Sequence, residues 1–318
     1  LRRWRVLHRW YCAMPRAGRN SPVARIRPTR TDTLNRHVRM PTERRIQLPH
    51  LALGALAWGD ENAPTLLALH GWLDNAASFA LLAPRLAEHY RVIALDLPGH
   101  GHADHLPPGA SYHYLDYVRT VLAAIDALQL DRLTLLGHSL GAGIAALTAA
   151  AAPDRIERLL LIEGLGPLGD DGSRTLQRFR EALAQGDRGR KPLRVFRDVA
   201  QAVSARSIVS GLPAELARPI VERGLIETEG GWRWRSDPQL TRASPTRLAE
   251  SQIHALLRGI DAPTDVLLAH PATSYLPSAP MQARAACVPD VRVTHLDGGH
   301  HLHLEHPAAV AEWVHSAS

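Results

Sequence analysis

The sequence predicts an α/β fold: a doubly wound, mostly parallel sheet with a helical lid inserted between two core strands. Short, uninterrupted apolar runs recur along the chain, as is typical of strands buried on both faces of a parallel sheet. Segments with helical periodicity separate these runs. A polar stretch at 166–250 interrupts the pattern, which resumes at Thr264.

The predicted elements follow from these patterns in chain order. Residues 44–50 and 51–59 are expected to form two short strands with a turn at Pro49. Buried strands are expected at 65–69, 91–95, 133–136, 156–162, 264–269 and 291–296. Helices are expected at 76–89, 114–128, 142–152, 280–286 and 307–316.

The chain therefore divides into three parts: an Arg-rich extension (1–42), an α/β core (43–165 and 251–318) and a lid (166–250). The extension shows no sustained periodicity, so we expect it to be disordered. It is a transit peptide, an electrostatic arm for an anionic surface, or residues upstream of a true start at Met40. We favour the last, because Leu1 is not a normal initiator. The lid is expected above the carboxyl ends of the strands, where open α/β sheets bind ligands.

The formal charge of +6 is unevenly distributed. Residues 1–45 contain 13 arginines against Asp32 and Glu43, so the other 273 residues have a net charge of −5. This mildly acidic core argues against a nucleic-acid partner. Neither cysteine, Cys12 or Cys287, has a local partner, and a reducing compartment fits. No apolar run reaches the roughly 18 residues of a membrane helix, so we expect a cytoplasmic protein without a membrane span.

The most informative stretch lies in the middle of the chain. A strand-like run at 133–136 leads into Gly-His-Ser-Leu-Gly at 137–141, and a helix-forming run of small residues follows. A strand that reverses into a helix within two residues forces the residue at the apex into a sparsely populated backbone conformation. In this context the pattern is typical of a nucleophile elbow, with Ser139 as the nucleophile. The backbone N–H of Leu140 then faces the oxygen of the attacked carbonyl.

Four segments, in this order and spacing, resemble the α/β-hydrolase fold family: LHGW (69–72), DLPGHG (96–101), GHSLG (137–141) and DGGHHLHLEHP (297–307). The resemblance covers about residues 44–315, and LHGWLDNAASF (69–79) makes the chain most similar to the serine hydrolase-like proteins. The family includes esterases, lipases, thioesterases, C–C bond hydrolases, haloalkane dehalogenases and epoxide hydrolases. The last two attack with an aspartate at the elbow, so Ser139 argues against both.

A serine hydroxyl needs a base to become a good nucleophile. We expect His300 in this role, because two glycines before it give a flexible loop and the family places its catalytic histidine there. His301 is the second candidate. A metal site among the neighbouring histidines is not expected, because no carboxylate or cysteine lies at a recognised zinc spacing. We therefore expect no metal and no cofactor.

The acid that orients the histidine is less obvious. Most relatives have an aspartate in the loop after the strand at 264–269, but residues 270–275 contain no acid. Some members take the acid from the loop after the preceding core strand, where Glu163 lies, so we assign Glu163 to this role. Asp265, at the start of its strand, is the weaker alternative. The order Ser139, Glu163, His300 agrees with that of the fold. If Glu163 is instead a surface carboxylate, the site is a dyad.

The substrate side of the site is expected in the loop after the strand at 65–69. There the backbone N–H of Trp72 should complete the oxyanion hole with that of Leu140. We assign His70, Gly71, Trp72 and His138 to the substrate pocket. His70 and Gly71 shape the loop, the indole of Trp72 forms a wall of the acyl pocket, and His138 flanks the nucleophile.

The sequence thus predicts a metal-independent serine hydrolase that cleaves a carboxylic ester or a related acyl bond through an acyl-enzyme. The expected partner is a small acyl substrate. Thioester or C–C bond hydrolysis at the same site is an alternative. Two alternatives belong to other functional classes. The protein is a catalytically weak, ligand-binding member of the family, or it is an adaptor that uses residues 1–45 to bind an anionic surface.

Overall fold

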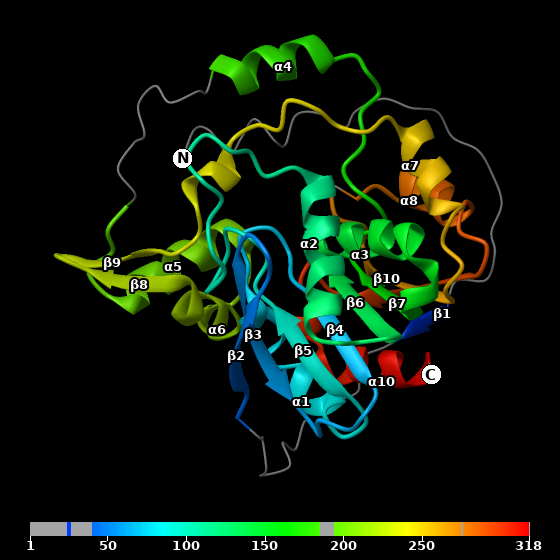
Figure 1. Ribbon diagram of the computed structural model, residues 1–318, viewed down its shortest axis with the longest axis horizontal. Helices are drawn as coiled ribbons and strands as arrows, with labels where there is room; N and C mark the ends of the chain where they lie inside the picture. The colour runs from blue at the N-terminus through cyan, green and yellow to red at the C-terminus, as the bar shows by residue number, and fades with distance from the viewer. Residues whose placement is uncertain (1–23, 27–39, 185–193, 275, 318) are drawn as a thin grey trace.

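A computed structural model of the protein describes residues 24–26, 40–184, 194–274 and 276–317 (Figure 1). Most of the extension predicted at 1–42 lies outside these residues. The part of it that is described before residue 40, Ala24–Ile26, forms strand β1, which pairs in parallel with β11 (Val291–Asp297). These three residues are thus paired within a stretch for which the sequence predicts disorder. Their own sequence shows no alternation, and the neighbouring strand supplies the backbone partners.

The described residues form a nine-stranded sheet in the order β1-β11-β10-β7-β6-β4-β5-β3-β2. The remaining strands are β2 (Thr42–Gln47), β3 (Ala52–Trp58), β4 (Thr65–Leu69), β5 (Arg91–Leu95), β6 (Leu133–His138), β7 (Ile156–Ile162) and β10 (Thr264–His270). Strand β3 runs antiparallel to both β2 and β5, and the other pairings are parallel. The predicted α/β-hydrolase architecture with a mostly parallel sheet is confirmed.

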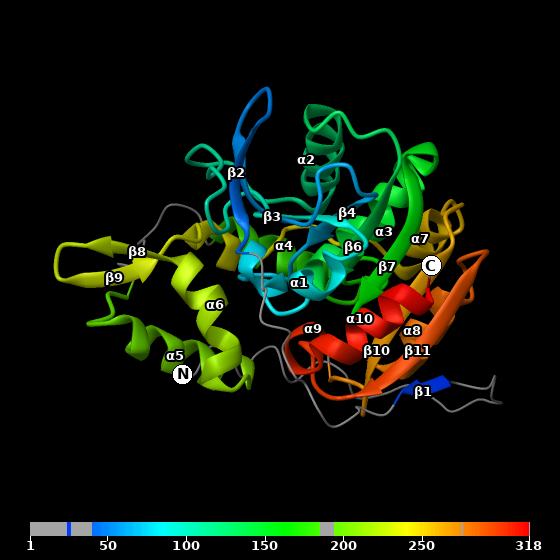
Figure 2. The ribbon, with the colours of Figure 1, turned by 90° about the horizontal axis from the view of Figure 1, so that it is seen from below.

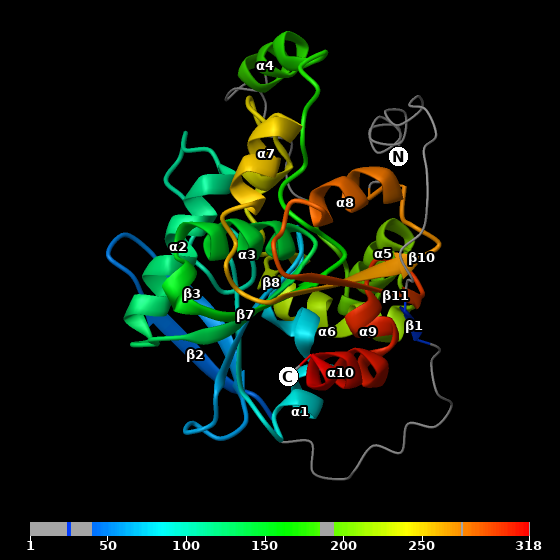
Figure 3. The same cartoon turned by 90° about the vertical axis from the view of Figure 1, so that its right-hand side faces the viewer.

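Helices cover both faces of this sheet (Figures 1 and 3). Alternate residues of β4 enter different cores: Leu67 and Leu69 face one, and Leu66 and Ala68 face the other. This alternation explains why the strand is apolar throughout. The first core is covered by α2 (Tyr114–Ala127), α3 (Leu140–Ala151), α7 (Glu250–Leu257) and α8 (Ser278–Ala285). The second is covered by α1 (Ala83–Leu86) and α10 (Pro307–Ser316).

Short elements account for the differences from the predicted helices. The helix expected at 76–89 is divided into the 3₁₀ turn η2 (Ala76–Phe79) and α1 (Ala83–Leu86). Pro84 explains the division. Proline would break a continuous helix at this position, but it is tolerated in the first turn of α1, where it lies. Two further short elements, η3 (Pro153–Arg155) and α9 (Leu302–Glu305), were not predicted.

The segment at 166–250 is inserted between β7 and β10 of the core sheet. It contains α4 (Thr175–Ala184), α5 (Val199–Ser210), α6 (Ala214–Gly224), the hairpin β8 (Leu225–Thr228) and β9 (Gly231–Trp234), and η4 (Pro238–Thr241). Helices α5 and α6 and the hairpin share a small core that includes Phe196 and Val221. Helix α4 lies apart from them, at the top of Figure 1, and has no buried residue.

Figure 2 views the molecule from below, with α5, α6 and the hairpin beside the sheet. Within the described ranges, no helix combines the length and the apolar composition that crossing a membrane requires.

Candidate active site

The turn between β6 and α3 has the geometry that the elbow motif requires. Ser139 has a φ of 53°, which is rare for a residue with a side chain. A Cβ atom on Gly141 would lie 2.1 Å from the carbonyl oxygen of Leu69, and one on Gly137 would lie 2.4 Å from the carbonyl oxygen of Gly141. Since both obstacles are backbone atoms, neither position accepts a side chain.

The loop after β11 brings His300 to Ser139. The Nε2 atom of His300 is 2.8 Å from Oγ of Ser139, and its Nδ1 atom is 3.0 Å from Oε2 of Glu163. An ionised carboxylate only accepts hydrogen bonds, so the proton of the imidazole is on Nδ1. Nε2 therefore has the lone pair that can accept the hydroxyl proton of Ser139. This hydrogen-bonded chain can remove a proton from the hydroxyl and stabilise the cation that forms.

Glu163 is held tightly at the end of β7. It is buried, and its backbone has a positive φ of 52°. Its Oε1 accepts the backbone N–H of Ala269 at 2.6 Å, and its Oε2 accepts the hydroxyl of Thr273 at 3.1 Å. Unusual backbone conformations cost about 1–3 kcal/mol and are concentrated at functional sites. The backbone conformation of Glu163 therefore makes this carboxylate a candidate functional group.

Asp265, the weaker candidate for the acid, lies elsewhere. Its carboxylate accepts hydrogen bonds from Arg158 (Nη2, 2.9 Å) and Arg292 (Nε, 2.5 Å). It pairs in register with Leu160 near the start of β10, at the opposite end of the strand from Ala269. Asp265 is therefore a structural ion-pair partner.

Two chain segments can supply backbone donors beside Ser139. Leu140 is the first residue of α3, and the first N–H groups of a helix have no acceptor within it. The loop after β4 packs against this helix, since a Cβ on Gly141 would also lie 2.8 Å from the carbonyl oxygen of His70. Trp72, two residues later, is 39% exposed. Its indole N–H donates to the carbonyl of Leu240 in the inserted segment at 3.1 Å.

His70, which the sequence assigns to the substrate pocket, lies inside the protein. It is fully buried, its Nδ1–H donates to the carbonyl of Gly71 at 2.7 Å, and its Nε2 accepts the N–H of Leu97 at 3.0 Å. Burial lowers the pKa of His70, so the ring is neutral. The ring therefore joins the loops that follow β4 and β5.

His138 is also inside the protein. Its Nε2–H donates to the carbonyl oxygen of His300 at 2.8 Å, and burial holds its pKa well below the usual value. A Cβ on Gly71 would lie 2.9 Å from Nδ1 of His138, so this glycine is in contact with the ring. Of the four residues assigned to the substrate pocket, Trp72 alone is exposed, and His138 instead holds the backbone of His300.

One residue that fixes the same loop was missed. The Glu305 carboxylate accepts the backbone N–H of Gly299 at 2.6 Å and that of His301 at 3.3 Å, on either side of His300. No local pattern marks a carboxylate six residues after a glycine as a loop anchor. Only the acidic residue in an otherwise histidine-rich segment could have drawn attention to it.

The neighbouring histidines are packed inside the protein. The Nε2–H of His303 donates to Oγ of Ser78 at 2.9 Å, because the hydroxyl proton of Ser78 is donated to Asp74, and burial lowers the pKa of His303 to about 3. Burial likewise lowers the pKa of His301 to about 4. Among the residues that the structure describes, no three or more His, Cys, Asp or Glu side chains are grouped so as to hold a metal ion.

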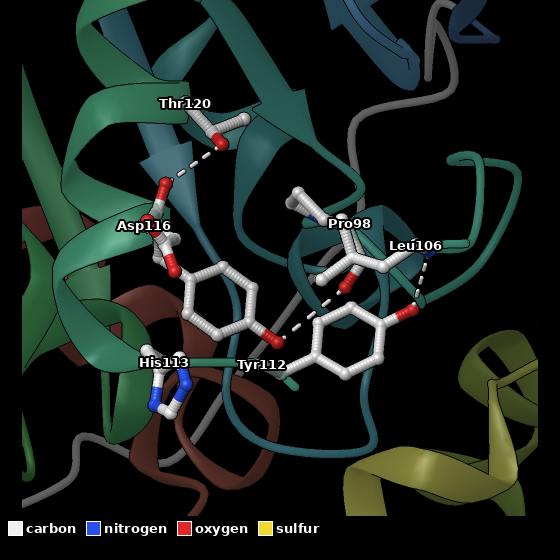
Figure 4. Close-up of a pocket in the computed structure, with 7 residues that line it drawn as sticks. Pro98, Leu106, Tyr112, His113, Asp116 and Thr120 are labelled. Carbon is white, nitrogen blue, oxygen red and sulfur yellow. Dashed lines mark hydrogen bonds between the residues drawn. The ribbon is translucent and has the colours of Figure 1, made fainter. Parts of the chain in front are cut away.

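Two small recesses lie on either side of Tyr112, in the loop before α2: one between α2 and the loop after β5, the other against residues 239–245 of the inserted segment. Figure 4 shows the first, about 20 Å³ in volume, where Tyr112 meets Pro98 and Leu106. A volume of this size holds about one water molecule. The second, about 40 Å³, lies between Tyr112 and Arg242. Neither is lined by a member of the Ser139–His300–Glu163 chain, so neither marks the reacting centre.

Comparison with known proteins agrees with this geometry. Residues 64–219 match the family model described as alpha/beta hydrolase fold. The chain is 31% identical over 277 residues to a serine hydrolase-like protein of Dictyostelium discoideum, covering 82% of this chain and 76% of the relative.

Two solved structures are also similar. A hypothetical protein of Pseudomonas aeruginosa is 41% identical with a TM-score of 0.79, covering 86% of this chain and 97% of that one. A thioesterase domain from the curacin biosynthetic pathway is 26% identical with a TM-score of 0.78, covering 87% and 99%. With the elbow and the nine-stranded sheet, these similarities show that the chain belongs to the α/β-hydrolase fold family and is related to the serine hydrolase-like proteins.

Proposed function

We propose that the protein is a serine hydrolase that cleaves a carboxylic ester or a related acyl bond. The observation that supports this most directly is the hydrogen-bonded chain from Ser139 Oγ through His300 to Glu163. His300 takes the proton of Ser139 as Oγ attacks the carbonyl carbon, and Glu163 stabilises the imidazolium and keeps its tautomer.

The remaining steps follow from the same groups. The backbone N–H groups of Leu140 and Trp72 donate to the oxyanion of the tetrahedral intermediate. When the intermediate collapses, His300 gives its proton to the leaving group, and the acyl group remains on Ser139. His300 then takes a proton from water, which attacks the acyl-enzyme, and a second collapse returns the proton to Ser139.

The inserted segment at 166–250 is, in this proposal, a cap that selects the acyl and leaving groups. Its contact with the loop after β4 supports this role, since the indole N–H of Trp72 donates a hydrogen bond to the carbonyl of Leu240 in the segment. Changes in the cap are expected to alter substrate preference without removing nucleophile reactivity.

A fluorophosphonate probe tests the proposal, because it labels a serine only when the hydroxyl is activated. Rapid labelling of the wild-type protein and none of Ser139→Ala is the expected result. A series of p-nitrophenyl esters with increasing acyl length then measures kcat/KM for ester cleavage. If the wild-type protein is neither labelled nor active, the proposal is wrong, and a ligand-binding role is favoured.

Thioester hydrolysis is the second candidate. It is favoured by the 26% identity to a thioesterase domain over almost the full length of that domain. The same acyl group, offered as a p-nitrophenyl ester and as an N-acetylcysteamine thioester, separates the two activities. A kcat/KM for the thioester well above that for the ester would favour the thioesterase.

A further inference from the structure

A second group of polar side chains lies directly beneath the reacting residues, around Asp74. We call it the Asp74 cluster: Asp74, Ser78, His138, Arg206 and His301. The Asp74 carboxylate is 3% exposed and accepts the hydroxyl of Ser78 at 3.2 Å and a hydrogen bond from Arg206. Its Oδ2 lies 3.9 Å from Nδ1 of His138 and 3.7 Å from Nε2 of His301.

The cluster touches the backbone of the proposed base through His138. The carbonyl oxygen of His300 only accepts, so the proton of His138 is on Nε2, at 2.8 Å from that oxygen. The opposite edge of the same ring faces Asp74. Gly71 closes one side, since a Cβ there would be 2.9 Å from Nδ1. Nδ1 and Oδ2 are both acceptors and are not hydrogen-bonded, so Asp74 acts on the ring through packing and charge, and a shift of Asp74 changes the packing of the ring that holds His300.

Arg206 comes from α5, in the inserted segment, 132 residues from Asp74. Its side chain is 14% exposed. Burial acts to raise the pKa of Asp74, but nearby positive charge, above all that of Arg206, outweighs it and lowers that pKa. Without Arg206, the buried carboxylate loses its main counter-charge, and an uncompensated buried charge is strongly unfavourable. Asp74 must then move, take a proton, or draw one onto a neighbouring imidazole.

We propose that Arg206 is a positioning residue of the active site: it fixes Asp74, and through Asp74 and His138 it sets the place of the His300 backbone. The inserted segment thereby completes the core site as well as covering it. This inference rests on the proposed function, because it concerns the same base.

The chain offers a matched control in Arg223 of α6. Its side chain is 8% exposed and joins the inserted segment to Asp96 (2.6 Å) and Glu43 (2.7 Å). Asp96 also accepts the backbone N–H groups of Ala76 and His102, at 2.7 and 2.9 Å. None of these contacts involves the elbow or the His300 loop. Loss of Arg223 therefore weakens the attachment of the segment beside the stretch that contains Asp74 and Ala76, but removes no contact of a side chain in the Asp74 cluster.

The test compares Arg206→Met, Arg206→Lys and Arg223→Met in the full chain, with kcat and KM for a p-nitrophenyl ester corrected for the folded fraction. Arg206→Met should lower kcat about 10- to 100-fold, since small misplacements of a catalytic group have effects of this size. KM should change less than about twofold, because the contact is not with substrate. Arg206→Lys should recover much of kcat, and Arg223→Met should keep it despite a similar loss of thermal stability.

A second readout does not depend on activity. Hydrogen exchange of the backbone at 298–305 should be faster in Arg206→Met and unchanged in Arg223→Met. If Arg206→Met does not fold, Arg206→Lys against Arg223→Lys gives the same comparison, and His138→Leu, which removes the donor to His300, should speed exchange while His138→Gln restores protection through its amide N–H.

Equal effects of the two arginine variants on kcat and on exchange, or none from Arg206→Met, would overturn the inference. If the wild-type protein neither reacts with the fluorophosphonate nor hydrolyses the ester, the proposed function fails. The exchange experiment still tests, in that case, whether Arg206 fixes the backbone at 298–305.

Discussion

Replacing Glu163 with glutamine preserves its shape but exchanges one acceptor oxygen for an NH₂ donor. In the wild-type protein, Oε1 accepts from Ala269 and Oε2 accepts from His300 and Thr273. If the glutamine oxygen faces Ala269, its NH₂ faces Nδ1 of His300 and forces the proton onto Nε2. That tautomer cannot take the proton of Ser139.

The reverse orientation is also unfavourable. The glutamine NH₂ would then face the N–H of Ala269, whose nitrogen is 2.6 Å from Oε1 in the wild-type protein. An unsatisfied buried donor costs about 1–3 kcal/mol, so this orientation is poorly populated. We therefore expect Glu163→Gln to lower kcat about 10⁴-fold, as a wrong tautomer does in serine proteases. This corresponds to about 5 kcal/mol of activation free energy.

Steady-state hydrolysis of a p-nitrophenyl ester measures the loss, and the rate of fluorophosphonate labelling measures it independently. Thermal unfolding reports the folded fraction. Asp265→Asn is the control, because it disturbs two ion pairs at the far end of β10 and should leave kcat unchanged. A near-wild-type kcat for Glu163→Gln, together with a strongly reduced kcat for Asp265→Asn, would refute the assignment of Glu163.

Three further predictions concern the nucleophile, the elbow and the buried histidines. Ser139→Ala should lower kcat about 10⁶-fold and leave the unfolding temperature almost unchanged, as triad knockouts do. Gly141→Ala should cost about 3 kcal/mol or more in urea unfolding, because its Cβ would lie 2.1 Å from a carbonyl oxygen. Gly109→Ala, with a φ of +89° but open space, should cost only about 1–2 kcal/mol. Burial lowers the pKa of His303 to about 3, below its unfolded value of about 6.5. The unfolded chain therefore binds more protons, and stability falls as pH drops below 6.5. His303→Gln should reduce that slope by about 0.7 kcal/mol per pH unit at about pH 6.5 and by about 1.4 kcal/mol per pH unit near about pH 5, measured by urea unfolding between about pH 4.5 and 6.5.

The buried strands were the most predictable part of the fold. The ranges predicted for β4, β5 and β7 match the observed bounds, because apolar residues on both faces leave few alternatives. The hairpin of β8 and β9 was missed, although Trp232 and Trp234 alternate with arginines as in a half-buried strand. Both tryptophans pack against the small core around Phe196, which the sequence alone does not reveal.

The site divides in the same way. Ser139 follows from a local motif whose glycines are required by close backbone contacts. The choice of Glu163 depended on the missing acid after β10 and on the order of strands in the family. Asp74, Arg206 and Glu305 could not be predicted, because their roles depend on contacts between distant or unpatterned positions. His70 and His138 were misplaced for the same reason: their ring partners are backbone atoms that only the folded chain brings near.

Ser139 and Glu163 share a backbone feature with a consequence for how the protein fails under stress. Both have a positive φ, of 53° and 52°, at the ends of adjacent strands. Such conformations persist only while the surrounding packing enforces them. As urea loosens that packing, these two peptide segments should relax first, into ordinary extended backbone. Loss of catalysis should therefore precede loss of helical circular dichroism, so that an inactive but still folded species accumulates at intermediate denaturant.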